Sequence, residues 1–153
     1  QDWQWILARW SRRPLQTILT VKFNNHMKTQ NNTAIQQTLF SGDNELMKID
    51  LYLDKQFGQG SVQALTIMAD IAELKKMLTE EVVHFVFEKT DGTTRDAYGT
   101  RAIDVIRKYD KGSTTQKPQR AFNGTFPYFD IEKGEWRCFK VDRFVMIDKD
   151  YTL

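Results

Sequence analysis

The chain has 153 residues, of which 41% are hydrophobic and 27% charged, with one cysteine and a formal net charge of +2. This balance is typical of a globular protein with a buried core, and one cysteine excludes an intrachain disulfide. The net charge is too small to indicate nucleic-acid binding by itself. The sequence has no apolar run as long as a membrane span, and its first residues do not form a good signal peptide, so we expect a cytoplasmic protein without a membrane partner.

The segment before residue 61 has two predicted parts. Residues 1–26, with three tryptophans among arginines, are interpreted as an extension outside the core, and the composition becomes polar from residue 27. The alternative for this extension is an arm that docks on another surface, because Trp and Arg favour interfaces. Within residues 27–60, residues 47–53 alternate apolar and polar side chains, which predicts a half-buried strand.

An amphipathic helix is predicted over residues 61–78. Ser61 is a suitable N-cap, because its hydroxyl can accept a hydrogen bond from a backbone N–H of the first turn. Apolar residues recur at helical spacing, and Lys75 and Lys76 fall in the last turn, where cations suit the helix dipole. We expect the apolar face to cover the β-domain that follows; the alternative is a groove for a partner.

Short strands and tight turns dominate residues 80–148. One hairpin turns at residues 90–93 and another at residues 132–135, and both turns contain a glycine that can adopt positive φ. Pro127 is expected at a sheet edge or a bulge, because it cannot donate to a ladder. Residues 102–109 form either a strand or one helical turn. The pattern predicts a mainly β (α+β) fold, a small five-stranded antiparallel barrel preceded by one amphipathic helix.

The second hairpin resembles the closing hairpin of WYL domains. In that family an acidic-basic-Gly turn leads to Trp-Arg-x-Phe-basic-aliphatic-Asp-Arg, and residues 134–143 match this pattern in order and spacing. The first hairpin is similar to the family's opening hairpin. The tripeptide that names the family falls on Gly-Thr-Phe at residues 124–126 and is lost. The resemblance covers roughly half of the chain and implies an Sm-like, Src-homology-3-like barrel.

The sequence predicts a single helix before the barrel, so we expect no helix pair of the kind that reads DNA, although such a pair is common before WYL domains in bacterial regulators. The chain therefore resembles the short, stand-alone WYL-like proteins of phages and gut bacteria. This resemblance implies a protein of the bacterial cell or of a phage-infected host. WYL domains are generally ligand-sensing or nucleic-acid-binding regulatory modules, and the resemblance implies the same class of function here.

The candidate binding residues are basic and aromatic. In an unbroken strand Arg137, Phe139 and Arg143 share one face, where guanidinium groups can bind phosphate and a ring can stack on a base. The alternative is that these arginines pair with Glu132, Asp130 or Asp142 and brace the hairpin. Residues 101–120 add six basic residues against two acidic ones, although such segments are often only solvated surface. The predicted site for a nucleotide or single-stranded nucleic acid comprises Arg101, Lys108, Lys111, Lys117, Arg120, Arg137, Phe139 and Arg143.

No local pattern indicates catalysis. His84 is interpreted as a packed strand residue and Cys138 as a small buried hydrophobe. No cluster has metal-ligand spacing, and no Gly-rich phosphate loop is present in the sequence. We therefore expect a non-enzymatic regulatory or accessory binding module without a metal or cofactor. The alternative is a protein-interaction or assembly module of phage or bacterial origin, which would bind a protein partner or form a homo-oligomer through strand edges.

Overall fold

The structure is a computed structural model that describes residues 42–112 and 116–150. The described residues divide into two compact units between Thr66 and Ile67. The extension predicted for residues 1–26 lies outside the described residues. We describe the two units in turn.

Two helices begin in the first unit, each at a side chain that caps its N-terminus. The carboxylate of Asp43 accepts a hydrogen bond from a backbone N–H in the first turn of α3 (Asn44–Phe57) at 3.0 Å. The Ser61 hydroxyl accepts one from the N–H of Ala64, at 3.1 Å, where α4 (Val62–Leu78) begins. Each cap satisfies a backbone donor that has no acceptor within the helix. Helix α4 thus occupies the segment in which the sequence predicts a helix.

The strand predicted over residues 47–53 is wrong, because this segment lies inside α3. Alternation of apolar residues over seven positions also fits a helix when two of them are one turn apart. Ile49 and Leu53 have this spacing and are fully buried, whereas Leu51 is 69% exposed. The helical spacing of the buried pair, together with the N-cap, therefore outweighs the alternation.

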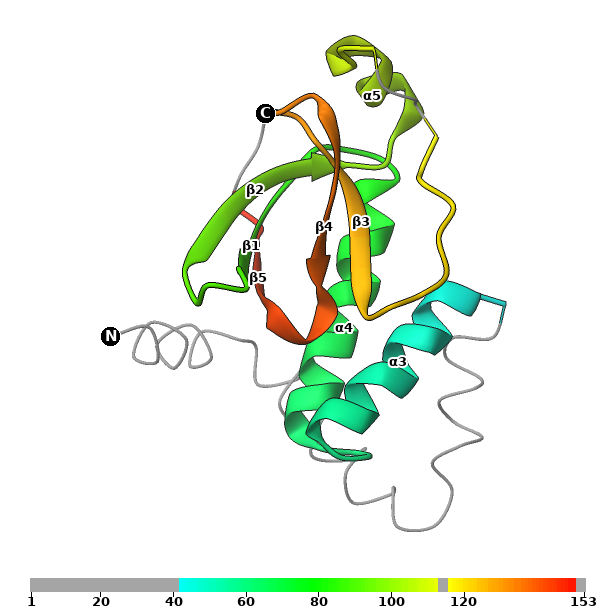
Figure 1. The fold of residues 1–153 in the computed structure, drawn as a ribbon, viewed down its shortest axis with the longest axis vertical. Coiled ribbons are helices and arrows are strands. Elements are labelled where there is room, and N and C mark those ends of the chain that lie inside the picture. The colour runs from blue at the N-terminus through cyan, green and yellow to red at the C-terminus, as the bar shows by residue number, and fades with distance from the viewer. Residues whose placement is uncertain (1–41, 113–115, 151–153) are drawn as a thin grey trace. The chain divides into compact units, whose positions relative to one another are not determined.

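The second unit is built around a five-stranded antiparallel sheet with the strand order β4-β3-β2-β1-β5 (Figure 1). Helix α5 follows β2, and a 3₁₀ turn, η1, joins β4 to β5. The bounds are β1 (Val83–Glu88), β2 (Thr94–Thr100), α5 (Ile103–Tyr109), β3 (Thr125–Asp130), β4 (Glu135–Lys140), η1 (Val141–Arg143) and β5 (Phe144–Asp148). The described chain therefore has two helices, α3 and α5, besides the one that the sequence predicts.

The sheet is curved, but its two edge strands are not paired with each other by backbone hydrogen bonds. Among the described strands, β4 pairs with β3 and β5 pairs with β1, but no register joins β4 to β5. Across this seam the rings of Phe139 on β4 and Phe144 on β5 have centroids 5.6 Å apart. Aromatic packing rather than backbone hydrogen bonding thus joins the two edge strands of the predicted barrel.

Both hairpins turn at a glycine with positive φ, where the sequence predicts them. At the first turn Gly92 has a φ of 86°, and the N–H of Lys89 donates to the carbonyl of Thr93 at 2.7 Å. At the second turn Gly134 has a φ of 68° and donates to the carbonyl of Asp130 at 2.8 Å. A side chain at either position would be strained, so the two turns fix where the strands reverse.

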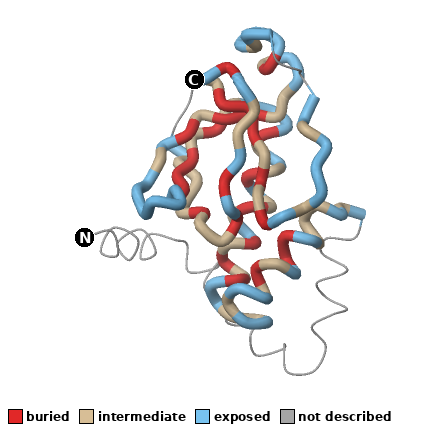
Figure 2. The backbone as a smooth tube through the Cα atoms, in the orientation of Figure 1, coloured by how far each residue is buried: buried red, intermediate tan, exposed pale blue. Residues whose placement is uncertain are grey.

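Aromatic rings fill the inner face of the sheet. Phe85 on β1 meets Tyr128 on β3 edge to face, with centroids 5.0 Å apart, and lies 5.6 Å from Phe139 on β4. Figure 2 shows the strands buried over much of their length. Gly99 on β2 permits this packing, because a Cβ there would lie 2.7 Å from Cδ2 of Tyr128 and 2.9 Å from Cε1 of Phe85. The core therefore requires a residue without a side chain at this position.

Pro127 lies where β3 has a locally open edge. The ladder between β3 and β2 contains only the pairs of Phe129 and Asp130, so Pro127 lies beyond it. The carbonyl of Pro127 instead accepts a hydrogen bond from Nε of Arg101 at 3.0 Å. The expected edge position of this proline is confirmed.

The end of α4 is held against the sheet by polar contacts. The backbone N–H of Arg101 donates to the carbonyl of Leu78 at 2.7 Å, and the Thr100 hydroxyl donates to the carbonyl of Glu81 at 2.9 Å. At the other side, Nζ of Lys149 lies 2.9 Å from Oε1 of Glu73. These contacts place the C-terminal end of α4 beside the sheet, and Ile71, Leu74 and Leu78 on this part of the helix are fully buried.

His84 joins three strands on the outer face. Its Nδ1 lies 2.9 Å from a carboxylate oxygen of Asp148 on β5, and its Nε2 lies 2.9 Å from one of Asp96 on β2. The imidazole also stacks on the ring of Tyr98, with centroids 4.6 Å apart. His84 is therefore a packed strand residue, as the sequence predicts.

Candidate nucleic-acid interface

The predicted row of Arg137, Phe139 and Arg143 does not form a surface row. Strand β4 ends before Arg143, which lies in η1, so the alternation of side chains is broken. Phe139 is only 3% exposed, and its ring stacks on that of Phe87 with centroids 5.2 Å apart. Because a buried ring cannot stack on a base, the prediction of an Arg–Phe–Arg platform is wrong. The sequence showed that Arg137 and Phe139 share a face, but not that Phe139 lies in the core.

The arginines at the two ends of this row contact carboxylates. Arg137 donates twice to one carboxylate oxygen of Glu135, at 3.0 Å from Nε and 2.7 Å from Nη2. Arg143 lies 3.3 Å from a carboxylate oxygen of Glu88 and donates to the carbonyl of Lys89 at 3.0 Å. Both arginines therefore pair with acidic residues, as the alternative interpretation holds, but not with the partners that it named. Glu135 is on the same strand as Arg137, and Glu88 belongs to the first hairpin.

Cys138, on the same strand as Arg137, corrects a further prediction. It is exposed rather than buried. Side chains alternate along a strand, and the neighbouring Phe139 points into the core, so Cys138 points outward. Phe139 is therefore the one residue of this strand whose side chain is buried.

Arg101 is held at the junction of the sheet and α5. Its guanidinium lies 4.0 Å from the ring centroid of Phe126, a cation–π contact, while its Nε donates to Pro127. Arg101 is half-buried, and it places one positive charge next to the N-terminal end of α5. The structure does not bring it together with Arg143, which contacts the other hairpin.

The last turn of helix α5 is basic, whereas its first turn carries the exposed Asp104, which lies 4.0 Å from Arg107. Among the side chains of α5 only that of Ile106 is buried, and most of the others are exposed to solvent (Figure 2). Arg107 and Lys108 lie in the last turn, where positive charge suits the helix dipole, and both are exposed. The predicted residues Lys117 and Arg120 are also exposed, in the connection that leads to β3.

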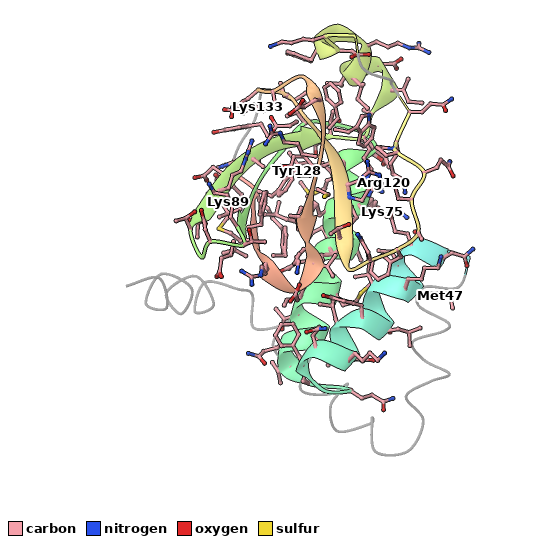
Figure 3. The ribbon with its side chains drawn as sticks, in the orientation of Figure 1. Met47, Lys75, Lys89, Arg120, Tyr128 and Lys133 are labelled. Carbon is pink, nitrogen blue, oxygen red and sulfur yellow. The ribbon has the colours of Figure 1, made fainter. Side chains whose placement is uncertain are left out.

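An exposed aromatic ring lies within this basic segment. Tyr109 is 42% exposed, and the exposed Lys108 and Lys111 lie beside it in the chain. Tyr109 is not among the binding residues predicted from the sequence, although an aromatic residue between basic ones is a pattern that indicates nucleic-acid binding. A Cβ at Gly134 would lie 2.9 Å from the carbonyl oxygen of Tyr109 and 3.0 Å from Cγ of Lys111. The end of α5 therefore rests on the β3–β4 turn, where Figure 3 shows Lys133.

Comparison with known proteins places this domain in a family. A model of WYL_2, described as an Sm-like SH3 β-barrel fold, matches residues 71–145. A relative from Enterobacteria phage T4, an uncharacterised 11.5 kDa protein of the Gp31–cd intergenic region, is 36% identical over 75 residues, which are 49% of this chain and 74% of the relative. The chain belongs to the WYL_2 family. The WYL-like resemblance and the Sm-like fold predicted from the hairpins are confirmed. No solved structure matches the chain.

The WYL_2 domain contains the basic segment. The matched residues run from within α4 to β5, so they include α5 and the connection to β3. Within residues 42–112 and 116–150, no group of three His, Cys, Asp or Glu side chains could hold a metal ion. No helix in the described part of the chain is both long and apolar enough to cross a bilayer.

Proposed function

We propose that this WYL_2 protein is a regulatory or accessory module that binds single-stranded nucleic acid through α5 and the basic connection after it. The observation that carries the proposal is the exposed ring of Tyr109 between the exposed Lys108 and Lys111. An aromatic ring stacks on any base, a contact worth about 1–3 kcal/mol, and lysines neutralise the neighbouring phosphates. In this proposal the protein binds without catalysing a reaction and needs no cofactor.

The local charge supports this choice of ligand. Residues 101–120 carry six basic residues and two acidic ones, Asp104 and Asp110. The carboxylate of Asp110 accepts the N–H of Gly112 at 3.0 Å, so it is engaged in the turn that follows α5. Arg101 adds its charge at the base of the helix. Phe139 has no direct role in binding here, because it belongs to the core.

Replacing Tyr109 with alanine is expected to weaken binding of a fluorescent single-stranded oligonucleotide about tenfold, because one stacking contact is lost. The double variant Lys108→Gln/Lys111→Gln should make the negative slope of log affinity against log salt shallower by about 1.4, the value for two lost phosphate contacts. Fluorescence anisotropy at several salt concentrations measures both effects.

The matched control removes the same charge from another surface. Lys48 and Lys55 are exposed on α3, and Lys48→Gln/Lys55→Gln should leave the salt slope close to that of the wild type. An equal loss in this control would show that binding follows net charge rather than α5. If the Tyr109→Ala variant binds as tightly as the wild type, Tyr109 does not stack on a base.

A further inference from the structure

A second polar cluster lies on the inner face of the sheet, apart from the basic surface of α5. Cross-strand pairing places Tyr128 opposite Arg137 and Asp130 opposite Glu135, and side chains two residues apart share a face. Figure 3 shows Tyr128 within the sheet. Arg95 on β2 reaches the same place, because its Nη2 lies 2.5 Å from Oδ2 of Asp130. Two arginines, two carboxylates and one phenol therefore meet near the β3–β4 turn.

The hydroxyl of Tyr128 is the unusual member of this cluster. The residue is 0% exposed, and its hydroxyl has no hydrogen-bond partner among the described residues. Burial raises the pKa of this hydroxyl, and the nearby Arg95 and Arg137 offset the effect only in part, so Tyr128 stays protonated at neutral pH. A phenylalanine would fill the same space without burying a polar group. The hydroxyl is thus a donor that suits an oxygen atom of a ligand.

The two arginines of the cluster are held differently. Asp130, the partner of Arg95, is 1% exposed and also accepts the N–H of Lys133 at 3.0 Å, so this ion pair is a fixed part of the core. Glu135, the partner of Arg137, is 52% exposed. Exposed ion pairs contribute little to stability, so a competing anion can replace Glu135 without unfolding the sheet.

We infer that Arg95, Tyr128 and Arg137 form a site for a phosphate group, distinct from the surface of α5, in which the phosphate takes the place of Glu135 on Arg137. Because Tyr128 is fully buried in this structure, the departure of Glu135 must also uncover its hydroxyl. One phosphate oxygen then accepts the hydrogen bond of Tyr128, and others accept from the arginines. A guanidinium binds phosphate in a two-bond geometry, and phosphate offers more acceptor oxygens than a carboxylate does. Arg95, fixed by Asp130, contributes charge and position. Glu135 moves into solvent when the site is filled.

Isothermal titration calorimetry of the full chain tests this site with inorganic phosphate and with a nucleoside monophosphate. Tyr128→Phe is expected to weaken binding at least tenfold. Glu135→Gln is expected to strengthen it severalfold, because the competing carboxylate is removed. Tighter binding of the nucleoside monophosphate would assign the phosphate to a nucleotide, and equal affinities would assign it to the free ion.

Three results would overturn the inference. One is that the wild type binds neither probe, and another is that Tyr128→Phe or Glu135→Gln leaves binding unchanged. The third comes from thermal unfolding without phosphate, in which Tyr128→Phe should be at least as stable as the wild type. A lower melting temperature would mean that the hydroxyl is already bonded within the protein. The α5 variant Lys108→Gln/Lys111→Gln should bind phosphate normally, which separates this site from the proposed nucleic-acid surface.

Discussion

Replacing Phe139 with alanine is expected to lower the free energy of unfolding by about 3–5 kcal/mol, the usual cost of removing a buried phenylalanine. The ring contacts those of Phe85, Phe126 and Phe144, with centroids 5.6, 5.5 and 5.6 Å away. The contact with Phe144 spans the seam between β4 and β5, where the described strands share no ladder. Urea denaturation followed by tryptophan fluorescence measures the change.

The matched control for Phe139 is Tyr109. Because Tyr109 is exposed at the end of α5, its replacement with alanine should change the free energy of unfolding by less than about 0.5 kcal/mol. Stability close to that of the wild type in Phe139→Ala would instead mean that this ring is available at the surface. In that case the platform predicted from the alternation along β4 would be restored, and the assignment of Phe139 to the core would be wrong.

Replacing Asp130 with alanine is expected to cost about 3 kcal/mol, near the lower end of the range for breaking a buried ion pair. The variant leaves Arg95 without its carboxylate and removes the acceptor of the Lys133 N–H, at the start of the β3–β4 turn. The cost lies at the lower end because the Arg95 side chain is partly exposed. Thermal and urea unfolding both report the loss.

The exposed pair next to it supplies the comparison. Glu135→Ala removes the partner of Arg137 on the same face, but both side chains are partly in solvent, so the expected cost is below about 1 kcal/mol. Equal costs for Asp130→Ala and Glu135→Ala would contradict the distinction between a fixed and an exchangeable carboxylate. That distinction is also the basis of the phosphate site.

The hairpins could be predicted because their signals are local. A glycine that adopts positive φ, as Gly92 and Gly134 do, determines where a strand reverses, whatever lies around it. The order of aromatic and charged residues after Gly134 also carried the resemblance to WYL domains. These local features led to the five antiparallel strands and to the family.

The sequence could not show which face of β4 is buried in the core. Alternation shows that Arg137 and Phe139 share a face, but burial of that face depends on Phe85 and Tyr128, which come from distant strands. The same limit applies to residues 47–53, whose alternation did not reveal that α3 buries Ile49 with Leu53. Register and burial are properties of several segments together, so patterns within one segment cannot supply them.

The approach of Arg95 to Asp130 is another non-local feature. The two residues are 35 positions apart, and the sequence pairs Arg95 with no particular partner. The buried hydroxyl of Tyr128 gives no sequence signal either, because tyrosine is common in strands for packing alone. By contrast, the exposure of Tyr109 follows from its place at the end of a short helix with one buried side chain.

The salt dependence of oligonucleotide binding by the wild-type protein tests the proposed function most directly. If about four phosphates are neutralised, the affinity for a single-stranded oligonucleotide should fall roughly 50-fold between about 50 and 200 mM salt. Fluorescence anisotropy with the full chain measures this change. A steep fall is the result predicted for α5 and the basic connection, and an absence of binding, or an affinity that does not change with salt, would contradict it.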